Sequence, residues 1–171
     1  MLKSMRSIVV AYDELRTIGK DGDIPWAGKL PADMRFFRDL TEDRAVIMGR
    51  KTFESLPDAF RPLPNRQNIV ISLSQKAMAG AFVVESIDEA LEIGGENAYI
   101  IGGAQVYRQT LSRVNRVYAT EIATRTEGGD TFFPELSEEE WQAISREEHE
   151  ADERNKFAYS FVTYLRRHPI E

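Results

Sequence analysis

The chain contains no cysteine and only two histidines, His149 and His168. Without cysteine there is no disulfide and no thiolate metal ligand, which suits a cytoplasmic protein. The two histidines are too few and too far apart to indicate a metal cluster, so no metal is expected. Long apolar runs are also missing. The N-terminal run covers only residues 8–11, which is too short for a signal peptide or a membrane span.

Positive charge is in deficit as well, because the formal net charge is −6. No stretch of the chain concentrates basic residues, which argues against a nucleic acid as partner. The remaining composition, 42% hydrophobic and 29% charged, is that of an ordinary globular protein. At 171 residues the simplest expectation is a single domain spanning residues 1–171, and a monomer is the default.

Short apolar runs, most of them rich in Val and Ile, alternate with short helical patterns along most of the chain. The runs predict strands at residues 7–11, 44–48, 68–71, 82–84, 98–101 and 116–122. The helical patterns predict helices at residues 31–40, 52–56, 86–93 and 105–111, and Ser86 with Glu89 forms a capping-box start. Such alternation is typical of an α/β fold with a largely parallel sheet, whose ligands bind at the carboxyl ends of the strands.

The C-terminal region is harder to interpret. Residues 138–154 are rich in helix formers, yet apolar residues from Trp141 to Thr163 fit an alternating pattern around a turn at residues 151–155. We therefore predict two long antiparallel strands there, against helix propensity in the first of them. The expected fold is an eight-stranded, mostly parallel central sheet with an antiparallel C-terminal strand, flanked by about four helices.

Asp33 is the most informative acidic residue. Pro31 suits the first turn of a helix, which places Asp33 in that turn and Phe36 and Phe37 three and four residues later on nearly the same face. A carboxylate beside aromatic rings can offer paired acceptors to a flat, nitrogen-rich ligand. Taken alone, the pattern favours the simpler alternative, an acid that complements the helix N-terminus above core phenylalanines, because acids are common in first turns.

Several loops carry chemistry of a second kind. Gly49 is followed by Arg-Lys-Thr at a predicted helix start, and Gly102-Gly103 follows a strand directly. Backbone N–H groups at helix starts bind phosphate, although an ordinary solvated turn would look the same. Residues 13–28 form a long loop of the kind that often serves as a lid. Arg61 and Arg66 follow in a proline-rich loop and could pair with a carboxylate.

Taken together and in order, these stretches resemble the dihydrofolate reductase family over essentially the whole chain. The resemblance rests on Ile24-Pro25-Trp26, Leu30-Pro-Ala-Asp33, Val46-Ile-Met-Gly-Arg-Lys-Thr52, Arg61-Pro-Leu-Pro-Asn-Arg66, Ile100-Ile-Gly-Gly103 and Gly129-Asp-Thr-Phe-Phe-Pro134. It implies NADPH-dependent reduction of 7,8-dihydrofolate to tetrahydrofolate. Hydride would pass from nicotinamide C4 to pterin C6, with protonation at N5. The competing readings are a pyrimidine reductase of riboflavin synthesis and a non-catalytic pterin- or nucleotide-binding module.

The resemblance also implies roles for individual residues. Asp33 would hydrogen-bond the N3 and 2-amino edge of the pterin, while the N5 proton would arrive through water. Trp26 and Thr120 would hold Asp33 and that water, and Ile24 and Tyr107 would complete the catalytic group. Arg66 would take the α-carboxylate of the glutamate tail, with Arg61 nearby. The apolar residues expected to line the substrate are Val9, Val10, Ile24, Met34, Phe37, Leu56, Leu63 and Ile101.

For the cofactor, the resemblance implies a cradle of glycines and helix starts around the phosphates. The expected set is Ala11, Ile18, Gly19, Gly49, Arg50, Lys51, Thr52, Ser72, Leu73, Ile101, Gly102, Gly103, Ala104, Gln105, Val106 and Tyr107. The peptide between Gly102 and Gly103 is expected to be cis. Leu73 and Gln105 stand where many members offer polar or basic groups to the 2′-phosphate, but Arg50 and Ser72 remain, and NADPH is the expected cofactor.

Overall fold

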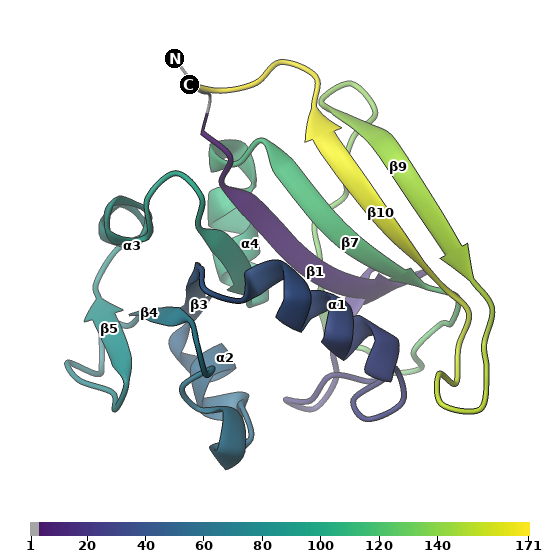
Figure 1. Ribbon diagram of the computed structural model, residues 1–171, viewed down its shortest axis with the longest axis horizontal. Helices are drawn as coiled ribbons and strands as arrows, with labels where there is room; N and C mark the ends of the chain where they lie inside the picture. Colours follow the sequence, from purple (N-terminus) through teal and green to yellow (C-terminus); the bar gives the residue numbers. More distant parts are fainter. Residues whose placement is uncertain (1–3) are drawn as a thin grey trace.

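The structure is a computed structural model that describes residues 4–171. Its centre is an eight-stranded sheet in the order β5-β4-β3-β6-β1-β7-β10-β9 (Figure 1). The strands are β1 (Ser7–Asp13), β3 (Ala45–Gly49), β4 (Gln67–Ile71), β5 (Ala81–Val84), β6 (Tyr99–Gly102), β7 (Arg116–Ile122), β9 (Trp141–His149) and β10 (Tyr159–Arg166). The first six strands in this order are parallel, and β10 is antiparallel to both of its neighbours. The predicted sheet is confirmed.

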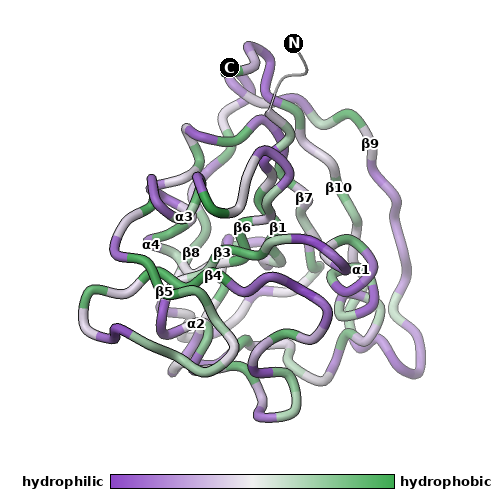
Figure 2. The backbone as a smooth tube through the Cα atoms, turned by 60° about the vertical axis from the view of Figure 1, so that its left-hand side comes forward, coloured by the Kyte–Doolittle hydropathy of each residue, from purple (hydrophilic) through white to green (hydrophobic). Residues whose placement is uncertain are grey.

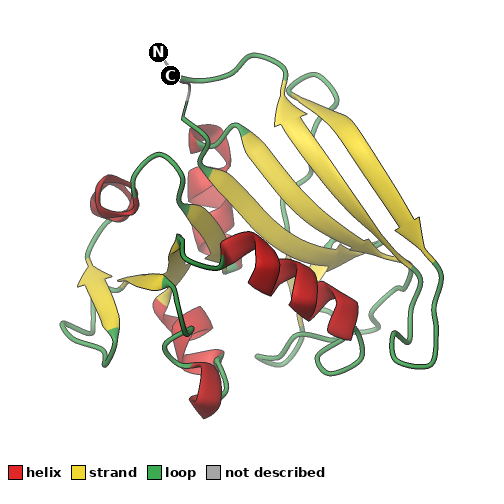
Figure 3. Ribbon diagram, in the orientation of Figure 1, coloured by secondary structure: helices red, strands yellow, loops and turns green. Residues whose placement is uncertain are grey.

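Four α-helices flank the sheet, as predicted (Figure 3). They are α1 (Pro31–Thr41), α2 (Arg50–Ser55), α3 (Ile87–Gly94) and α4 (Ala104–Thr110), and 3-10 turns form Asp58–Phe60 and Leu111–Arg113. Residues of α3 and α4 pack into one core cluster with Ile47, Ile69 and Ile100. Phe37 of α1 and Phe53 of α2 pack with Val46 and Met48 on the opposite face. Neighbouring residues of each strand therefore enter different halves of the core, as the pleat requires.

Local signals set the beginnings of two helices. Pro31 occupies the first position of α1, and the N-cap, Leu30, offers no side-chain acceptor. The acceptor comes instead from Asn155, whose side-chain oxygen takes the backbone N–H of Ala32 at 3.0 Å. In α3 the predicted cap is present, because the Ser86 hydroxyl accepts from the backbone N–H of Glu89 at 3.1 Å. The start of α1 thus depends on a turn more than a hundred residues away in the sequence.

The long loop after β1 contains a strand that the sequence patterns do not predict. β2 (Thr17–Gly19) pairs antiparallel with β8 (Thr131–Phe132) in a separate two-stranded sheet. A Cβ on Gly129 would lie 2.5 Å from the Thr17 side chain, so glycine is needed for this close approach. With three residues in β2 and two in β8, neither segment is long enough to show a periodic pattern in the sequence. They become strands only because two distant loops pair with each other.

The two C-terminal strands confirm the preference for alternation over helix propensity. β9 forms the sheet edge, and most of its side chains are exposed, while Trp141 at its start is buried. Figure 2 shows this edge as largely hydrophilic beside the apolar central strands. The pairing register shifts between Thr163 and Tyr164, which marks a bulge or irregularity. An exposed, charged edge strand discourages pairing with other chains, which explains its Glu-rich composition.

Candidate active site

Asp33 lies in the first turn of α1 and faces strand β7. The Thr120 hydroxyl donates a hydrogen bond to its Oδ1 at 2.6 Å. Asp33 is half-buried by exposed area, yet protein surrounds it on most sides. Burial raises the pKa of the Asp33 carboxyl, and the bond from Thr120 opposes this effect without cancelling it. The site therefore holds a carboxyl group that takes up a proton more readily than an ordinary aspartate.

Trp26 packs against the residues that hold the start of α1 in place. It is 3% exposed and packs in one cluster with Leu30, Ile122 and Tyr159. Among residues 4–171 it makes no hydrogen bond to Asp33, so its contribution within the protein is packing beneath the start of α1. The predicted pair of supporters thus divides into a hydrogen-bonding one, Thr120, and a packing one, Trp26.

The apolar residues predicted to line the substrate take three positions. Phe37, Leu56 and Ile101 pack against the cluster that contains Leu63, on the face of the sheet covered by α1. Ile24 and Met34 are 55% and 62% exposed, and large exposed apolar side chains are the kind that a ligand covers. Val9 and Val10 are adjacent in β1, so their side chains point to opposite faces of the sheet. Val9 shares a face with Tyr118, while the Val10 side chain packs in the cluster on the opposite face.

The two predicted arginines lie in different places, Arg66 at the far end of α1 and Arg61 after α2, where it also donates to the Glu54 carbonyl at 2.8 Å. Arg66 is held by three protein acceptors: its guanidinium donates to the Thr41 hydroxyl at 3.1 Å, to the Arg38 carbonyl at 3.0 Å and to the Pro64 carbonyl at 2.6 Å. Arg61 is paired instead with Asp58 at 2.6 Å. Burial lowers the pKa of Arg66, but its group remains charged at neutral pH. Arg66 is therefore oriented in advance, whereas Arg61 already has a carboxylate partner.

A glycine-lined cradle lies where β3 and β6 end and two helices begin. The peptide between Gly102 and Gly103 is cis, as expected. Gly102 has a φ of +131°, and a Cβ there would lie 3.4 Å from the Tyr107 hydroxyl. A Cβ on Gly103 would lie 3.3 Å from the Thr52 hydroxyl, and a Cβ on Gly49 would touch Val106 at 3.4 Å. Glycine therefore lets the starts of α2 and α4 approach each other closely.

The basic residues of this cradle differ in their freedom. Arg50 is tied to Glu54 in the next turn of α2 at 2.8 Å, while Lys51 is exposed. Ser72 is buried, and its hydroxyl accepts from the backbone N–H of Gln75 at 2.9 Å. Leu73 beside it is 78% exposed, and Gln105 is exposed at the start of α4. The predicted residues thus lie around the carboxyl ends of β3, β4 and β6.

Tyr107 is more deeply placed than a residue that simply faces a ligand. Its hydroxyl donates to the Val9 carbonyl at 2.7 Å, and its ring packs edge-on against Phe133 at 5.1 Å. Burial raises its pKa, and the nearby Asp33 charge adds to the shift. The Tyr107 phenol therefore stays neutral and links α4 to β1 between the two predicted ligand regions.

Asp13 is the residue that the sequence patterns missed. Its carboxylate accepts the backbone N–H groups of Leu15 at 2.9 Å, Thr17 at 2.8 Å and Thr126 at 2.7 Å. It thereby fixes the start of the loop that carries Ile18 and Gly19, and it joins that loop to the segment after β7. Aspartate is a known turn former, and its place at the end of β1, before a long loop, was the available signal.

Within residues 4–171 no group of His, Asp and Glu side chains has the arrangement of a metal site. None of the helices described is long and apolar enough to cross a bilayer. The remaining features define an α/β protein with an enclosed carboxyl group beside a glycine cradle suited to a phosphate-bearing ligand.

The comparisons with known proteins agree with this description. The family model described as "Dihydrofolate reductase" matches residues 5–166. A dihydrofolate reductase of Bacillus subtilis is 42% identical over 166 residues, covering 95% of both chains. One of Haemophilus influenzae is 39% identical, covering 94% of this chain and 98% of its own. The chain belongs to the dihydrofolate reductase family.

A solved structure gives the same result in three dimensions. It is a dihydrofolate reductase from Enterococcus faecalis, described as complexed with NADP(H) and RAB-propyl. This chain superimposes on it with a TM-score of 0.85 and 35% identity, covering 97% of this chain and 98% of the other. The eight-stranded fold is therefore that of the family.

Proposed function

We propose how the residues described above carry out the family's reaction, the NADPH-dependent reduction of 7,8-dihydrofolate to 5,6,7,8-tetrahydrofolate. The chain is an oxidoreductase of this kind with a small-molecule substrate, and its site should also accept antifolate inhibitors, as the complex of the Enterococcus faecalis relative supports. The observation that carries the residue assignment is the half-buried Asp33 carboxyl group, which lies in the first turn of α1 and accepts from Thr120 at 2.6 Å.

Asp33 binds the pterin through the acceptor positions that Thr120 leaves open. A carboxylate has about four lone-pair sites, and the Thr120 hydroxyl takes one of them on Oδ1. Oδ2 and the rest of Oδ1 can accept from N3 and the 2-amino group of a pterin. Because burial raises its pKa, Asp33 shares a proton readily with the bound heterocycle. The proton for N5 comes through water, because Asp33 binds the opposite edge of the ring system.

The apolar face of the site positions the pterin and its aminobenzoyl extension. Phe37, Leu56, Leu63 and Ile101 form the inner wall, and Ile24 and Met34 close over the ligand. Val9 lines this side directly, while Val10 contributes only its backbone because its side chain packs in the core of the opposite face. Excluding water here strengthens every polar contact that Asp33 makes.

The glycine cradle fits NADPH, because Gly49, Gly102 and Gly103 let the starts of α2 and α4 pack closely against Val106, Tyr107 and Thr52, and helix starts that lie together offer backbone N–H groups to phosphates. Thr52, Ala104 and Val106 line the pyrophosphate position, with Lys51 and Arg50 supplying charge and Gln105, Ser72 and Leu73 near the adenosine end. Ala11, Ile18, Gly19 and Tyr107 enclose the nicotinamide end. The cofactor, when bound, supplies the hydride. The protein's own part is orientation and exclusion of water.

The decisive measurement is the loss of NADPH near-ultraviolet absorbance on addition of dihydrofolate. We expect turnover that saturates in both ligands and is abolished by methotrexate, with NADPH preferred over NADH. Saturable binding of both ligands without turnover would instead support a non-catalytic binding module. Turnover of a pyrimidine substrate in place of dihydrofolate would support the pyrimidine reductase alternative.

Arg66 is the proposed partner of the glutamate-tail carboxylate, and Arg66→Gln tests it. Losing a charge-assisted pair should raise KM for dihydrofolate by about tenfold or more, with a smaller change in kcat. A reduced pterin without the glutamate tail is the control substrate, and the variant should treat it as the wild type does. An equal loss with both substrates would show that Arg66 acts only by holding the end of α1. Arg61→Gln should have the smaller effect, because Arg61 is paired with Asp58.

We further propose that residues 1–171 form a single domain that works as a monomer in the cytoplasm. One eight-stranded sheet with all four α-helices packed against it supports the single domain. The absence of cysteine supports the cytoplasm, and a charged edge strand that discourages association supports the monomer. Light scattering on the purified protein should give the mass of one chain, and a dimer mass would contradict the proposal.

A further inference from the structure

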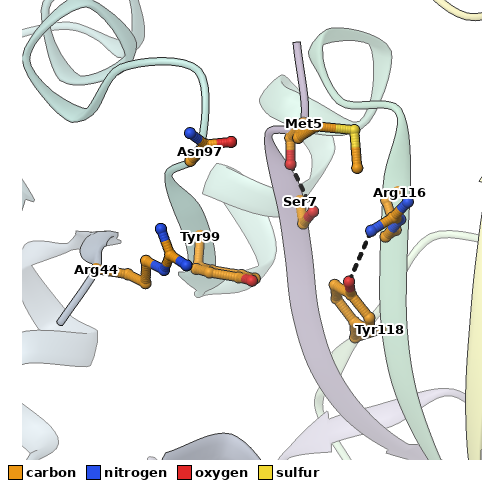
Figure 4. Close-up of a pocket in the computed structure, with 7 residues that line it drawn as sticks. All are labelled: Met5, Ser7, Arg44, Asn97, Tyr99, Arg116 and Tyr118. Atoms are coloured by element: carbon orange, nitrogen blue, oxygen red, sulfur yellow. Dashed lines mark hydrogen bonds between the residues drawn. The ribbon is translucent and has the colours of Figure 1, made fainter. Parts of the chain in front are cut away.

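A polar pocket with a volume of about 290 Å³ lies at the end of the sheet opposite the glycine cradle, where the central strands β1, β6 and β7 begin (Figure 4). Its lining includes Ser7, Arg44, Asn97, Tyr99, Arg116 and Tyr118. Ser7, Tyr99 and Arg116 are the first residues of β1, β6 and β7, whereas the cradle glycines Gly49 and Gly102 are the last residues of their strands. The strands are parallel, so the two sites are a full strand length apart.

The strand register builds this pocket. Ser7 is aligned with Tyr99 on one side and with Arg116 on the other, so the three side chains stand abreast on one face of the sheet. Tyr118 lies two residues further along β7 and therefore on the same face. Ser7 is the small residue in the middle, and its hydroxyl is turned to the Met5 carbonyl at 2.8 Å. Space consequently remains between the larger side chains, and Figure 4 shows Tyr99 between the two arginines.

Both arginines of the pocket lack a carboxylate partner among the residues described, and none of the pocket's lining residues is acidic. The Arg116 side chain donates to the Tyr118 hydroxyl at 2.9 Å, and its guanidinium carbon lies 5.7 Å from the centroid of the Tyr118 ring. Its buried Nε has no hydrogen-bond acceptor within residues 4–171. Buried donors are nearly always satisfied, so such a group calls for an explanation. Nearby Arg113, by contrast, is paired with Asp88 at 2.9 Å.

The remaining donors also point to an anion. Because the Tyr118 oxygen accepts from Arg116, its own hydrogen is free to be donated. Tyr99 adds a second hydroxyl, and both arginines lie close enough to favour its phenolate form, although burial outweighs them and raises its pKa. Two guanidiniums, two phenols and the Asn97 amide thus line one pocket in a chain whose net charge is −6. This local excess of positive charge is opposite in sign to the net charge of the whole protein.

We propose that this pocket binds a small phosphate dianion, either inorganic phosphate or a phosphate monoester. Two positive charges match the two negative charges of the ligand. Donors that come from two strands, β6 and β7, and from the segments before β3 and β6 suit a tetrahedral group with several acceptor oxygens better than a planar carboxylate. Arginine is the residue best fitted to bind such oxygens in pairs. The proposal does not depend on the roles assigned to Asp33 or to the cradle.

The test is calorimetric titration of the NADP-saturated enzyme with inorganic phosphate against chloride at equal ionic strength. Saturation occupies the cofactor's own phosphate positions, so they cannot contribute. We expect Arg44→Gln and Arg116→Gln each to weaken phosphate binding by about tenfold, and the double variant to abolish it. Arg113→Gln is the matched control at the same end of the sheet. Because Arg113 is paired with Asp88, this variant should change the phosphate affinity by less than about twofold. Methyl phosphate in place of phosphate separates the two sources: comparable binding assigns a monoester, and weaker binding assigns the free ion.

Dihydrofolate turnover and circular dichroism establish that each variant is folded. Arg44 is exposed, so Arg44→Gln provides the test if Arg116→Gln does not fold. Arg116→Lys keeps the charge but loses Nε, and it should bind phosphate more weakly than the wild type but more strongly than Arg116→Gln. Unchanged phosphate affinity in the Arg44→Gln and double variants would overturn the proposal. Absence of saturable binding to the wild type, or tighter binding of malonate than of phosphate, would overturn it as well.

Discussion

Asp13 and Asp33 are two shielded aspartates on the same protein, and their surroundings give them opposite acidities. Asp13 is only 2% exposed, sealed by its own loop near the surface, and three backbone N–H groups bind its carboxylate. Asp33 remains open to a ligand, but it lies deeper within the protein and receives one hydroxyl. Burial raises the pKa of Asp13, but its hydrogen bonds outweigh this and lower it overall, whereas burial dominates at Asp33 and raises its pKa.

The difference shows that hydrogen-bond donors, rather than solvent exposure, decide what a shielded carboxylate does. A carboxylate whose lone pairs are filled by backbone groups can only hold a loop in place. One that keeps acceptor positions open, in surroundings that disfavour its charge, gains stability by binding a ligand that donates to it. The four predictions that follow test this contrast, in order of decreasing effect.

Asp33→Asn should cause the largest loss. The amide cannot accept from both donors of the pterin edge or share its proton, so we expect turnover to fall by about 100-fold or more. Folding and NADPH binding should be retained, because the side-chain oxygen of Asn can still accept the hydrogen bond that Thr120 donates to Asp33. Steady-state kinetics with a cofactor-binding titration checks both expectations. Near-normal turnover would refute the role given to Asp33.

Asp13→Asn should mainly affect stability. The amide nitrogen would face the backbone N–H of Thr126, so one hydrogen bond and the charge are lost together. We expect the free energy of unfolding to fall by about 1–3 kcal/mol, measured by urea denaturation. Asp33→Asn is the comparison, and it should show no such loss. If both variants lost stability equally, the contrast between the two aspartates would be wrong.

Thr120→Val removes the single donor to Asp33 while keeping the shape of the side chain. Without that donor the pKa of Asp33 should rise further, and stability at neutral pH should fall by about 1 kcal/mol. Turnover should remain above about a tenth of the wild-type value, because the carboxylate is still present. Thr163→Val on β10 is a matched control, since Thr163 has no side-chain hydrogen bond among the residues described. A loss as large as that of Asp33→Asn would assign Thr120 a direct part in the reaction.

The pH dependence of stability should have opposite signs at the two aspartates. At Asp13 the folded pKa is lowered, so its stabilisation is present above the ordinary aspartate value, about 4, and is lost as pH falls through the folded value. At Asp33 the folded pKa is raised, so its contribution is full below about 4 and is lost as pH rises through the folded value. Urea titrations from acid to neutral pH should show Asp13→Asn approaching the wild type in acid. Asp33→Asn should gain on the wild type toward neutral pH. The same slope for both variants would contradict the assignment.

Much of the fold was predictable because its signals are local. Apolar runs located the parallel strands, Pro31 marked the start of α1, and Ser86 with Glu89 marked the start of α3. The alternation from Trp141 to Thr163 correctly predicted strands against helix propensity. Asp33 and the glycine pair stood out for the same reason, since each adjoins a recognisable helix or strand end, although the resemblance to a family was needed to name the ligands.

What the tertiary structure alone decided arises from residues far apart in the chain. Asn155 completes the start of α1, Thr17 and Gly129 approach closely enough to pair β2 with β8, and Arg66 is aimed by Thr41 and Arg38. The Arg44–Arg116 pocket depends on the strand order and register that place Tyr99, Ser7 and Arg116 side by side. The amino-acid sequence by itself determined the elements and the chemistry available at their ends, because propensity and periodicity act over a few residues. Which of those ends meet was settled only when the sheet formed, because central neighbours such as β1 with β6 and β7, or β3 with β6, are far apart in the chain.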